Sequence, residues 1–202
     1  MASTPVIALR YQRAELEQKA NLSPAGRAVL AGATGPERLI AALAATGNYR
    51  DAVYALTMIL PHRQAAWWAC LAVRLLPDLA ARAEDLAAVE VAEHWVQSTA
   101  PVDAERAGEA ADRCNLDLAP GWAAMAAYWS GASIAPRGQQ PVPPAPHLPG
   151  VATRTALLLL TLEPALNGRV SLGDFLEIGL ALMKGDVGRT AQASVRARLA
   201  GG

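Results

Sequence analysis

The sequence predicts an all-α protein: an irregular bundle or short superhelix of about eight antiparallel helices, with a proline-rich strap. Alanine and leucine dominate a composition that is 52% hydrophobic and poor in β-branched residues, which favours helices over strands. Consecutive segments of helical periodicity are separated by short proline- and glycine-containing turns, which is typical of antiparallel helix pairs. The run from Ala65 to Val73 has no polar side chain, and a helix that is apolar on every face belongs in the middle of a protein.

The segment 61–76 is therefore expected to be the central helix. Trp67 and Trp68 are adjacent in it, so on a helix their side chains point about 100° apart and reach different neighbours. Tryptophans in helical register with leucine, methionine or alanine are expected to be core residues. The alternative is that Trp67, Trp122 or Trp129 belongs to an aromatic groove that binds a partner.

Start and stop signals divide the rest of the chain into helices. Before the central helix, Ser23-Pro24 and Gly35-Pro36 each open a helix, and Asn48 caps another with Asp51 three residues on. After it, Ser171 and Asp174 form a capping-box pattern. The helices expected from these signals and from the apolar periodicity are 10–20, 24–32, 36–47, 48–60, 61–76, 81–98, one from 101, 120–131, 150–163 and 172–184.

The chain has 202 residues, enough for one domain with a core that needs no disulfide. We expect a single helical domain over residues 1–185 and a flexible C-terminal tail over 186–202, where glycine, alanine and arginine predominate. Within the domain, residues 132–149 are too rich in proline for helix or sheet and are expected to be extended. We call them the proline strap.

Composition also restricts the environment and the partners. The formal net charge is zero, which argues against nucleic acid or an anionic membrane surface as the partner. The N-terminal residues lack the basic start and apolar run of a signal peptide, and the most apolar run, Thr155 to Leu162, is too short to cross a bilayer. Two cysteines are too few for a disulfide scaffold. We therefore expect a cytoplasmic protein without membrane insertion.

No motif in the sequence assigns catalysis. It has no zinc-protease or paired-cysteine motif, no nucleophile elbow and no phosphate-binding or dinucleotide-binding loop. We therefore predict no catalytic residue, no cofactor and no metal ligand. The alternative is a metal-dependent or thiol enzyme with its site among Glu90, His94 and Cys114.

The proline strap is the best functional candidate. Its Pro141-Val-Pro-Pro144 and Pro143-Pro-Ala-Pro146 segments have the spacing that aromatic-lined grooves of partner proteins recognise. In the other interpretation, which we favour from the sequence, the strap lies across this protein's own helices, with prolines against tryptophan faces and Leu148 buried. If it binds a partner, the residues expected to do so are Arg137, Pro141, Pro143, Pro144, Pro146 and His147.

Four segments together carry a resemblance to a known group of proteins. They are Ala65 to Arg74 with its double tryptophan, Ala92 to Val96, Gly121 to Pro136, and Pro141 to Leu148. Over about residues 30–185 the chain resembles an uncharacterised family of bacterial all-helical proteins, a domain of unknown function found near type VI secretion components. The family has no established catalytic residues. The resemblance thus implies a genomic context and no mechanism.

These observations lead to one expectation and three alternatives. We expect a non-catalytic adaptor or accessory protein that binds another protein, linked to bacterial type VI secretion. The alternatives are a metal-dependent enzyme, a thiol enzyme and an immunity-type inhibitor of a neighbouring toxin.

Overall fold

The computed structural model describes residues 8–135, 138–166 and 168–201, and within these ranges the chain forms eleven α-helices, two short 3-10 helices and no strand. The predicted all-α class is confirmed. The count of about eight was too low, because each of the ten segments expected from the sequence forms its own helix and α11 follows near the C-terminus. The helices are α1 (Arg13–Lys19), α2 (Pro24–Gly32), α3 (Pro36–Ala45), α4 (Tyr49–Ile59), α5 (His62–Val73), η1 (Leu79–Ala81), α6 (Ala83–Ser98), α7 (Pro101–Ala111), α8 (Ala119–Trp129), α9 (Leu148–Leu162), η2 (Pro164–Leu166), α10 (Leu172–Met183) and α11 (Arg189–Gly201).

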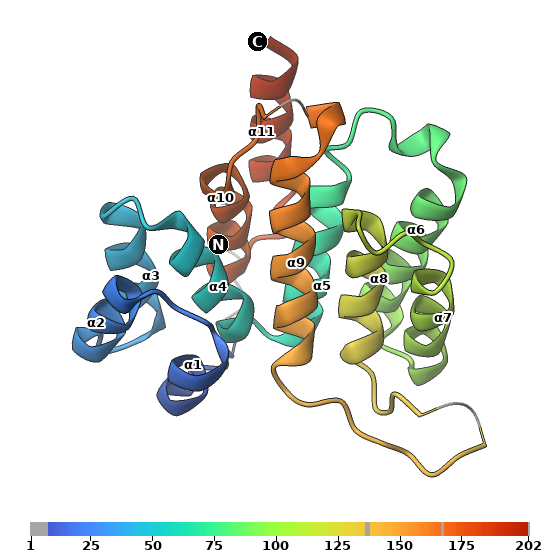
Figure 1. Ribbon diagram of the computed structural model, residues 1–202, viewed down its shortest axis with the longest axis horizontal. Helices are drawn as coiled ribbons and strands as arrows, with labels where there is room; N and C mark the ends of the chain where they lie inside the picture. The colour runs from blue at the N-terminus through green and yellow to red at the C-terminus, as the bar shows by residue number, and fades with distance from the viewer. Residues whose placement is uncertain (1–7, 136–137, 167, 202) are drawn as a thin grey trace, which may run out of the picture.

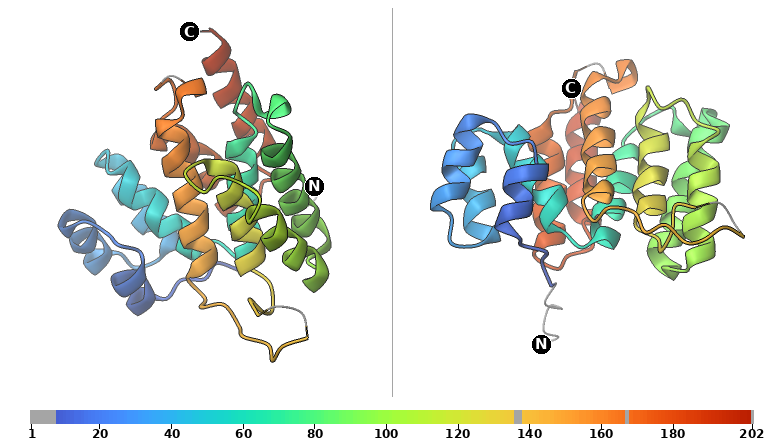
Figure 2. Two further views of the ribbon diagram at one scale, coloured as in Figure 1. Left: turned by 45° about the vertical axis from the view of Figure 1, so that its right-hand side comes forward. Right: turned by 60° about the horizontal axis from the view of Figure 1, so that its bottom comes forward.

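Helix α5 lies at the centre of the molecule. It packs against α6, α8, α9, α10 and α11, and α9 runs alongside it, nearer the viewer, in Figure 1. Helices α1 to α4 form one flank, and α6, α7 and α8 form the opposite flank (Figures 1 and 2). The chain thus builds one flank, passes through the centre as α5, builds the other flank and returns to the centre through α9 and α10.

The apolar composition of α5 is matched by its burial. Trp68 is fully buried, as are Ala65, Cys70 and Val73. The indole Nε1 of Trp68 donates a hydrogen bond of 2.9 Å to the carbonyl oxygen of Phe175 on α10, so the polar atom of this buried side chain is satisfied. The expectation that this segment forms the core holds for all of α5 except its N-terminal end and Trp67, which is only half-buried.

Two glycines allow the helices around α5 to approach closely. A Cβ atom on Gly179 of α10 would lie 2.5 Å from the Trp68 ring. A Cβ atom on Gly150 of α9 would lie 2.6 Å from the backbone carbonyl oxygen of Thr57 on α4. Side chains at these two positions would therefore separate α10 from α5 and α9 from α4.

The helix-capping signals found in the sequence lie at helix ends in the structure. The Ser23 hydroxyl accepts from the amide of Gly26, and the Asn48 side chain accepts from the amide of Asp51. Ser171 and Asp174 form the reciprocal capping box. Gly47 has a φ of 71°, the left-handed conformation expected where α3 ends. Each of these positions satisfies helix-end groups that would otherwise lack a partner.

Asp51 is a fully buried carboxylate that joins α4 to the start of α2. Its oxygens accept from the Ser23 amide at 3.1 and 3.2 Å, from the Ser23 hydroxyl, from Asn48 Nδ2 at 2.9 Å and from Arg50 Nη1 at 2.8 Å. Burial raises the pKa of this carboxyl. The hydrogen bonds from Ser23 and Asn48 and the charge of Arg50 outweigh burial and hold the pKa below its usual value.

The lowered pKa of Asp51 predicts a pH-dependent contribution to stability. A carboxyl whose pKa is lower in the folded than in the unfolded state stabilises the fold above its unfolded pKa, and this contribution is lost as the pH falls through the folded pKa. We expect Asp51→Asn to lower the free energy of unfolding by about 1–2 kcal/mol near pH 7, because it weakens charge-assisted hydrogen bonds. Urea unfolding of both proteins at a series of pH values should show this difference shrinking in acid, and a constant difference would contradict the assignment.

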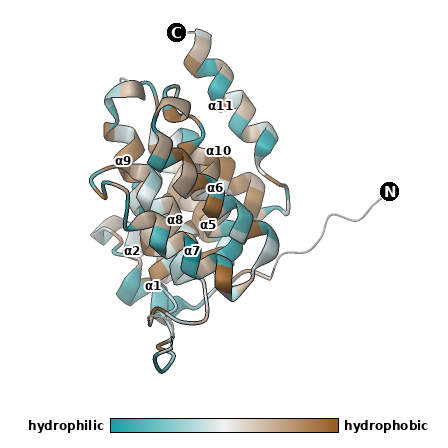
Figure 3. Ribbon diagram, turned by 90° about the vertical axis from the view of Figure 1, so that its right-hand side faces the viewer, coloured by the Kyte–Doolittle hydropathy of each residue, from teal (hydrophilic) through white to brown (hydrophobic). Residues whose placement is uncertain are grey.

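The expected flexible tail is instead helix α11, so this part of the prediction was wrong. The side chain of Gln192 is buried, and its Nε2 donates to the carbonyl oxygen of Leu71 at 2.6 Å; Arg196 donates to the carbonyl oxygen of Arg74 at 2.7 Å. Val195 is also buried, although hydrophilic residues recur along the helix (Figure 3). Long-range hydrogen bonds thus attach α11 to the end of α5, although the sequence of α11 contains few apolar residues.

The apolar run near the C-terminal end of α9 is a packing surface. Ala156, Leu157 and Leu160 are fully buried, whereas Leu162 is 77% exposed next to the turn at Glu163-Pro164. In the part of the chain that the structure describes, no helix combines the length and apolar content needed to span a membrane.

Candidate functional site

Hydrogen bonds join the two sides of the proline strap where it follows α8. The Tyr128 hydroxyl donates to the carbonyl oxygen of Ile134 at 2.8 Å, and the Ile134 amide donates to the carbonyl oxygen of Val142 at 2.9 Å. The Ser133 hydroxyl oxygen accepts from the Val142 amide at 3.0 Å. These bonds join the two sides of the strap where it leaves the bundle.

The other end of the strap is anchored to the start of α5 and α9. His62 Nε2 lies 2.9 Å from the carbonyl oxygen of Pro146, and the Leu148 amide donates to the carbonyl oxygen of Ala145. Burial, followed by the charge of Arg10, lowers the pKa of His62. The imidazole is therefore neutral near pH 7, and its Nε2 carries the proton that Pro146 accepts.

Between its two anchors the strap is exposed. Pro141, Pro143 and Pro146 are exposed, and Val142 is 50% exposed, whereas Pro144 is half-buried. The strap projects beyond the ends of α8 and α9 (Figures 1 and 2). The favoured expectation, prolines covered by this protein's own helices, is therefore wrong for the three exposed prolines.

The remaining strap residues lie near the helices. His147 is half-buried, and burial followed by the charge of Lys19 lowers its pKa. Leu148, expected to be tucked in as part of the strap, is half-buried and already the first residue of α9. Arg137 lies outside the described residues.

Glu90 and His94, proposed for an enzyme site, lie four residues apart on α6, but Cys114 does not join them. His94 pairs with Asp103 at 3.3 Å near the C-terminal end of α6. Cys114 instead lies near the other end of α6, with its sulfur 3.7 Å from the carbonyl oxygen of Glu84. Burial, followed by the charge of Asp85, raises the pKa of Cys114 to about 11, so it is not an activated thiol. No metal-binding group of three His, Cys, Asp or Glu side chains occurs among the described residues.

Trp67, Trp122 and Trp129, the candidates for an aromatic groove, lie in different surroundings. Trp122 and Trp129 pack edge to face, with ring centroids 6.1 Å apart, and Trp122 Nε1 donates to the carbonyl oxygen of Leu116. Trp67, by contrast, lines a pocket with a volume of about 490 Å³. We call this the Trp67 pocket; it is formed by Arg63, Gln64, Trp67, Glu93, Val96, Gln97, Leu182, Gly185, Asp186, Val187 and Arg189.

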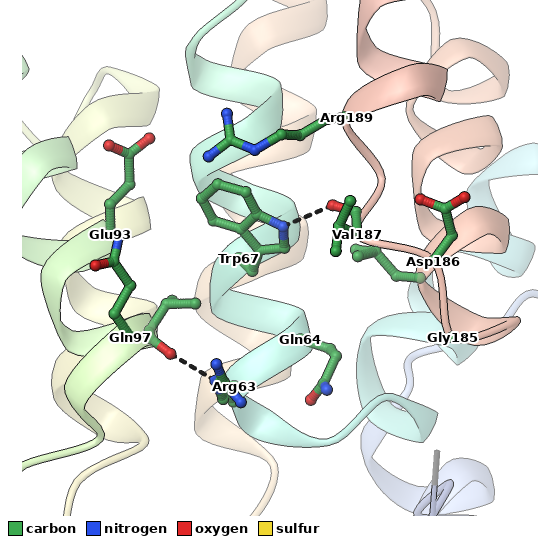
Figure 4. A pocket seen from close by; sticks show the side chains of 11 residues that line it. Arg63, Gln64, Trp67, Glu93, Gln97, Gly185, Asp186, Val187 and Arg189 are labelled. Carbon is green, nitrogen blue, oxygen red and sulfur yellow. Dashed lines mark hydrogen bonds between the residues drawn. The ribbon is translucent and has the colours of Figure 1, made fainter. Parts of the chain in front are cut away.

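The Trp67 pocket has an aromatic wall beside several charged groups. Trp67 Nε1 donates to the carbonyl oxygen of Val187 at 2.8 Å, and the Arg189 guanidinium lies 5.0 Å from the centre of the ring (Figure 4). Arg63, one turn before Trp67 on α5, donates from Nε to the carbonyl oxygen of Val96. The lining residues come from α5, α6, the end of α10, the segment after it and the start of α11, so the pocket exists only in the folded chain.

Comparison with known proteins gives a family but no function. The model of a family of unknown function (DUF6931) matches residues 39–183, which is most of the chain. This chain belongs to the DUF6931 family. No curated protein and no solved structure matches it.

The DUF6931 match covers one candidate surface completely and the other only in part. It includes the whole proline strap and the side of the Trp67 pocket formed by α5 and α6. The opposite wall, Gly185 to Arg189, lies beyond the matched residues.

The sequence did not predict Arg63 or Arg189 as site residues. Arg63 lies on α5 with Trp67, but the pocket beside them forms only where α6 and the start of α11 pack against α5, and no local pattern encodes that packing.

Proposed function

We propose that this DUF6931 protein is a non-catalytic adaptor or accessory protein that binds another protein through its proline strap. The supporting observation is that the strap exposes Pro141, Pro143 and Pro146 while hydrogen bonds hold both of its ends. Fixing the ends reduces the conformational entropy that the segment loses on binding. A proline-rich segment held in this way suits an aromatic-lined groove on a partner.

The remaining elements of this proposal are the location and the biological context. We propose that the protein acts in the cytoplasm and that its partner belongs to a bacterial type VI secretion apparatus, as the resemblance of the four sequence segments implies. The neutral net charge fits a protein partner better than nucleic acid. The separation of His94 and Cys114, which lie near opposite ends of α6, supports a non-catalytic role.

Partner capture tests the strap directly. The full chain is immobilised, incubated with lysate of the encoding organism, and the captured proteins are identified by mass spectrometry and then retested in purified form. We expect a triple variant, Pro141→Ser with Pro143→Ser and Pro146→Ser, to bind the purified partner at least about tenfold more weakly, because anchor residues carry most of the binding free energy. Its free energy of unfolding should fall by no more than about 1 kcal/mol per proline, because serine only restores conformational entropy to the unfolded chain.

The matched control replaces two exposed prolines outside the strap, Pro24→Ser and Pro101→Ser, and should bind like the parent. Equal affinity of the strap variant and the control would exclude the strap as the binding site. Failure to find a reproducible partner, with secretion unaffected by deletion of the gene, would contradict the adaptor proposal. Capture of a neighbouring toxin that the protein inhibits would favour the immunity alternative.

A further inference from the structure

The Trp67 pocket exposes an aromatic side chain in the middle of the central helix. Ala65, Ala66, Trp68 and Ala69 around it are all fully buried, yet Trp67 is only half-buried. Its one polar atom is already satisfied by Val187, so the ring offers an apolar surface to the pocket. Removing that surface from water on binding is favourable.

Two cations in the pocket have no carboxylate partner among the described residues. Arg189 lies against the Trp67 ring and Arg63 bonds to a backbone carbonyl, and neither forms an ion pair with a carboxylate that the structure describes. Guanidinium groups bind carboxylates with paired, directional hydrogen bonds and also stack on aromatic rings. These two side chains are thus available to an anion placed beside the indole.

The acidic residues of the pocket do not cancel these two charges. Glu93 is held by Arg74, whose Nε and Nη2 donate to its two oxygens at 3.0 and 2.7 Å. Asp186 is exposed, and its Oδ1 accepts from the Gly188 amide at 2.9 Å. Because Arg74 neutralises Glu93, the pocket keeps two positive charges, Arg63 and Arg189, against the single negative charge of Asp186.

We propose that the Trp67 pocket binds a ligand that carries a carboxylate next to a flat apolar group. The apolar group lies against the Trp67 ring, and the carboxylate accepts hydrogen bonds from one of the two arginines, Arg63 or Arg189. The side-chain amides of Gln64 and Gln97, on either side of Arg63 in Figure 4, supply further donors. The volume of about 490 Å³ suits a small molecule or the last residue of a peptide. This inference is independent of the proline strap.

Nuclear magnetic resonance of the tryptophan indole N–H groups tests the site in the full chain. The sequence has five tryptophans, and the Trp67 signal is the one that disappears in Trp67→Phe. Phenylacetate is the probe for a free acid, and phenylacetamide is its uncharged counterpart. The peptide acetyl-Gly-Gly-Phe, with a free C-terminal carboxylate, is the probe for a peptide end.

We expect phenylacetate to shift the Trp67 signal with a millimolar dissociation constant, as suits a ligand of about ten non-hydrogen atoms. Phenylacetamide should bind at least about tenfold more weakly, and so should phenylacetate to the double variant Arg63→Gln with Arg189→Gln, because each change removes the charge-assisted hydrogen bond to the carboxylate. Arg38→Gln, which changes an exposed arginine on α3, is the control and should bind like the parent. Tighter binding of the peptide than of phenylacetate would identify a peptide end as the source of the carboxylate.

Three results would overturn this assignment. One is the absence of a saturable shift of the Trp67 signal with both phenylacetate and the peptide. Another is equal affinity for phenylacetate and phenylacetamide, which would show that the charge is not recognised. The third is binding that survives both arginine substitutions.

Discussion

Replacing Trp68 by alanine is expected to lower the free energy of unfolding by about 3–5 kcal/mol, the range typical of a buried aromatic residue truncated to alanine. Trp68 is fully buried, it fills the space left by Gly179, and it donates to the carbonyl oxygen of Phe175. The substitution would leave a cavity between α5 and α10 and would remove the hydrogen bond to that carbonyl. The cavity and the lost hydrogen bond both lower the free energy of unfolding.

Urea unfolding followed by circular dichroism measures this loss, and Trp122→Ala is the matched control. Trp122 is the same residue type but is half-buried on α8, so its truncation should cost clearly less than that of Trp68. If Trp68→Ala unfolds at the same urea concentration as the parent, α5 is not the centre of the core. A similar loss for both variants would show that burial does not distinguish the two positions.

The sequence predicted the centre of this fold because the signal there is local. A helix segment without polar side chains has to be buried, and Ala65 to Val73 are buried apart from Trp67. The exposure of Trp67 was not predictable, because it depends on the gap that α6 and the segment before α11 leave beside α5. Adjacent tryptophans were expected to reach different neighbours, and in the structure one reaches Phe175 and the other Val187.

The two wrong predictions have a common physical origin. Helix α11 was missed because Gln192 and Arg196 attach it to carbonyl oxygens at the end of α5, and such long-range bonds leave no periodic pattern. The strap was expected to be extended from its prolines, but whether it is covered depends on the helices around it. Composition defines the conformation of such segments better than it defines their neighbours.

A second large loss of stability is expected from Arg82→Met. Arg82 joins the start of α6 to the end of α9: its Nη2 lies 2.9 Å from Glu163 and 2.8 Å from Asp78, and its Nη1 lies 3.9 Å from Asp85. Glu163 and Asp85 are buried, so methionine would leave two buried carboxylates without their cation. Removing one partner of a buried ion pair costs about 3–5 kcal/mol, and partial exposure of Arg82 places the expected loss near the lower end, about 3 kcal/mol near pH 7.

The pH dependence of this loss separates the charge effect from lost packing. Burial already raises the pKa of Asp85, with the charge of Arg82 opposing it, and without Arg82 the pKa rises further. A buried carboxyl with a raised pKa destabilises the fold above that pKa, and the penalty disappears as the pH falls through it. The free-energy difference between parent and Arg82→Met should therefore be smaller near pH 4.5 than near pH 7.

Arg198→Met provides the comparison for this measurement, because Arg198 also meets two carboxylates, Asp174 and Glu177, but is about half exposed. Exposed pairs of this kind contribute about 0–1 kcal/mol, so its loss should be small and nearly independent of pH. An Arg82→Met loss that does not change between the two pH values would mean that its aliphatic packing, and not its charge, joins α6 to α9. A loss no larger than that of Arg198→Met would mean that water reaches Glu163 and Asp85 in the folded protein.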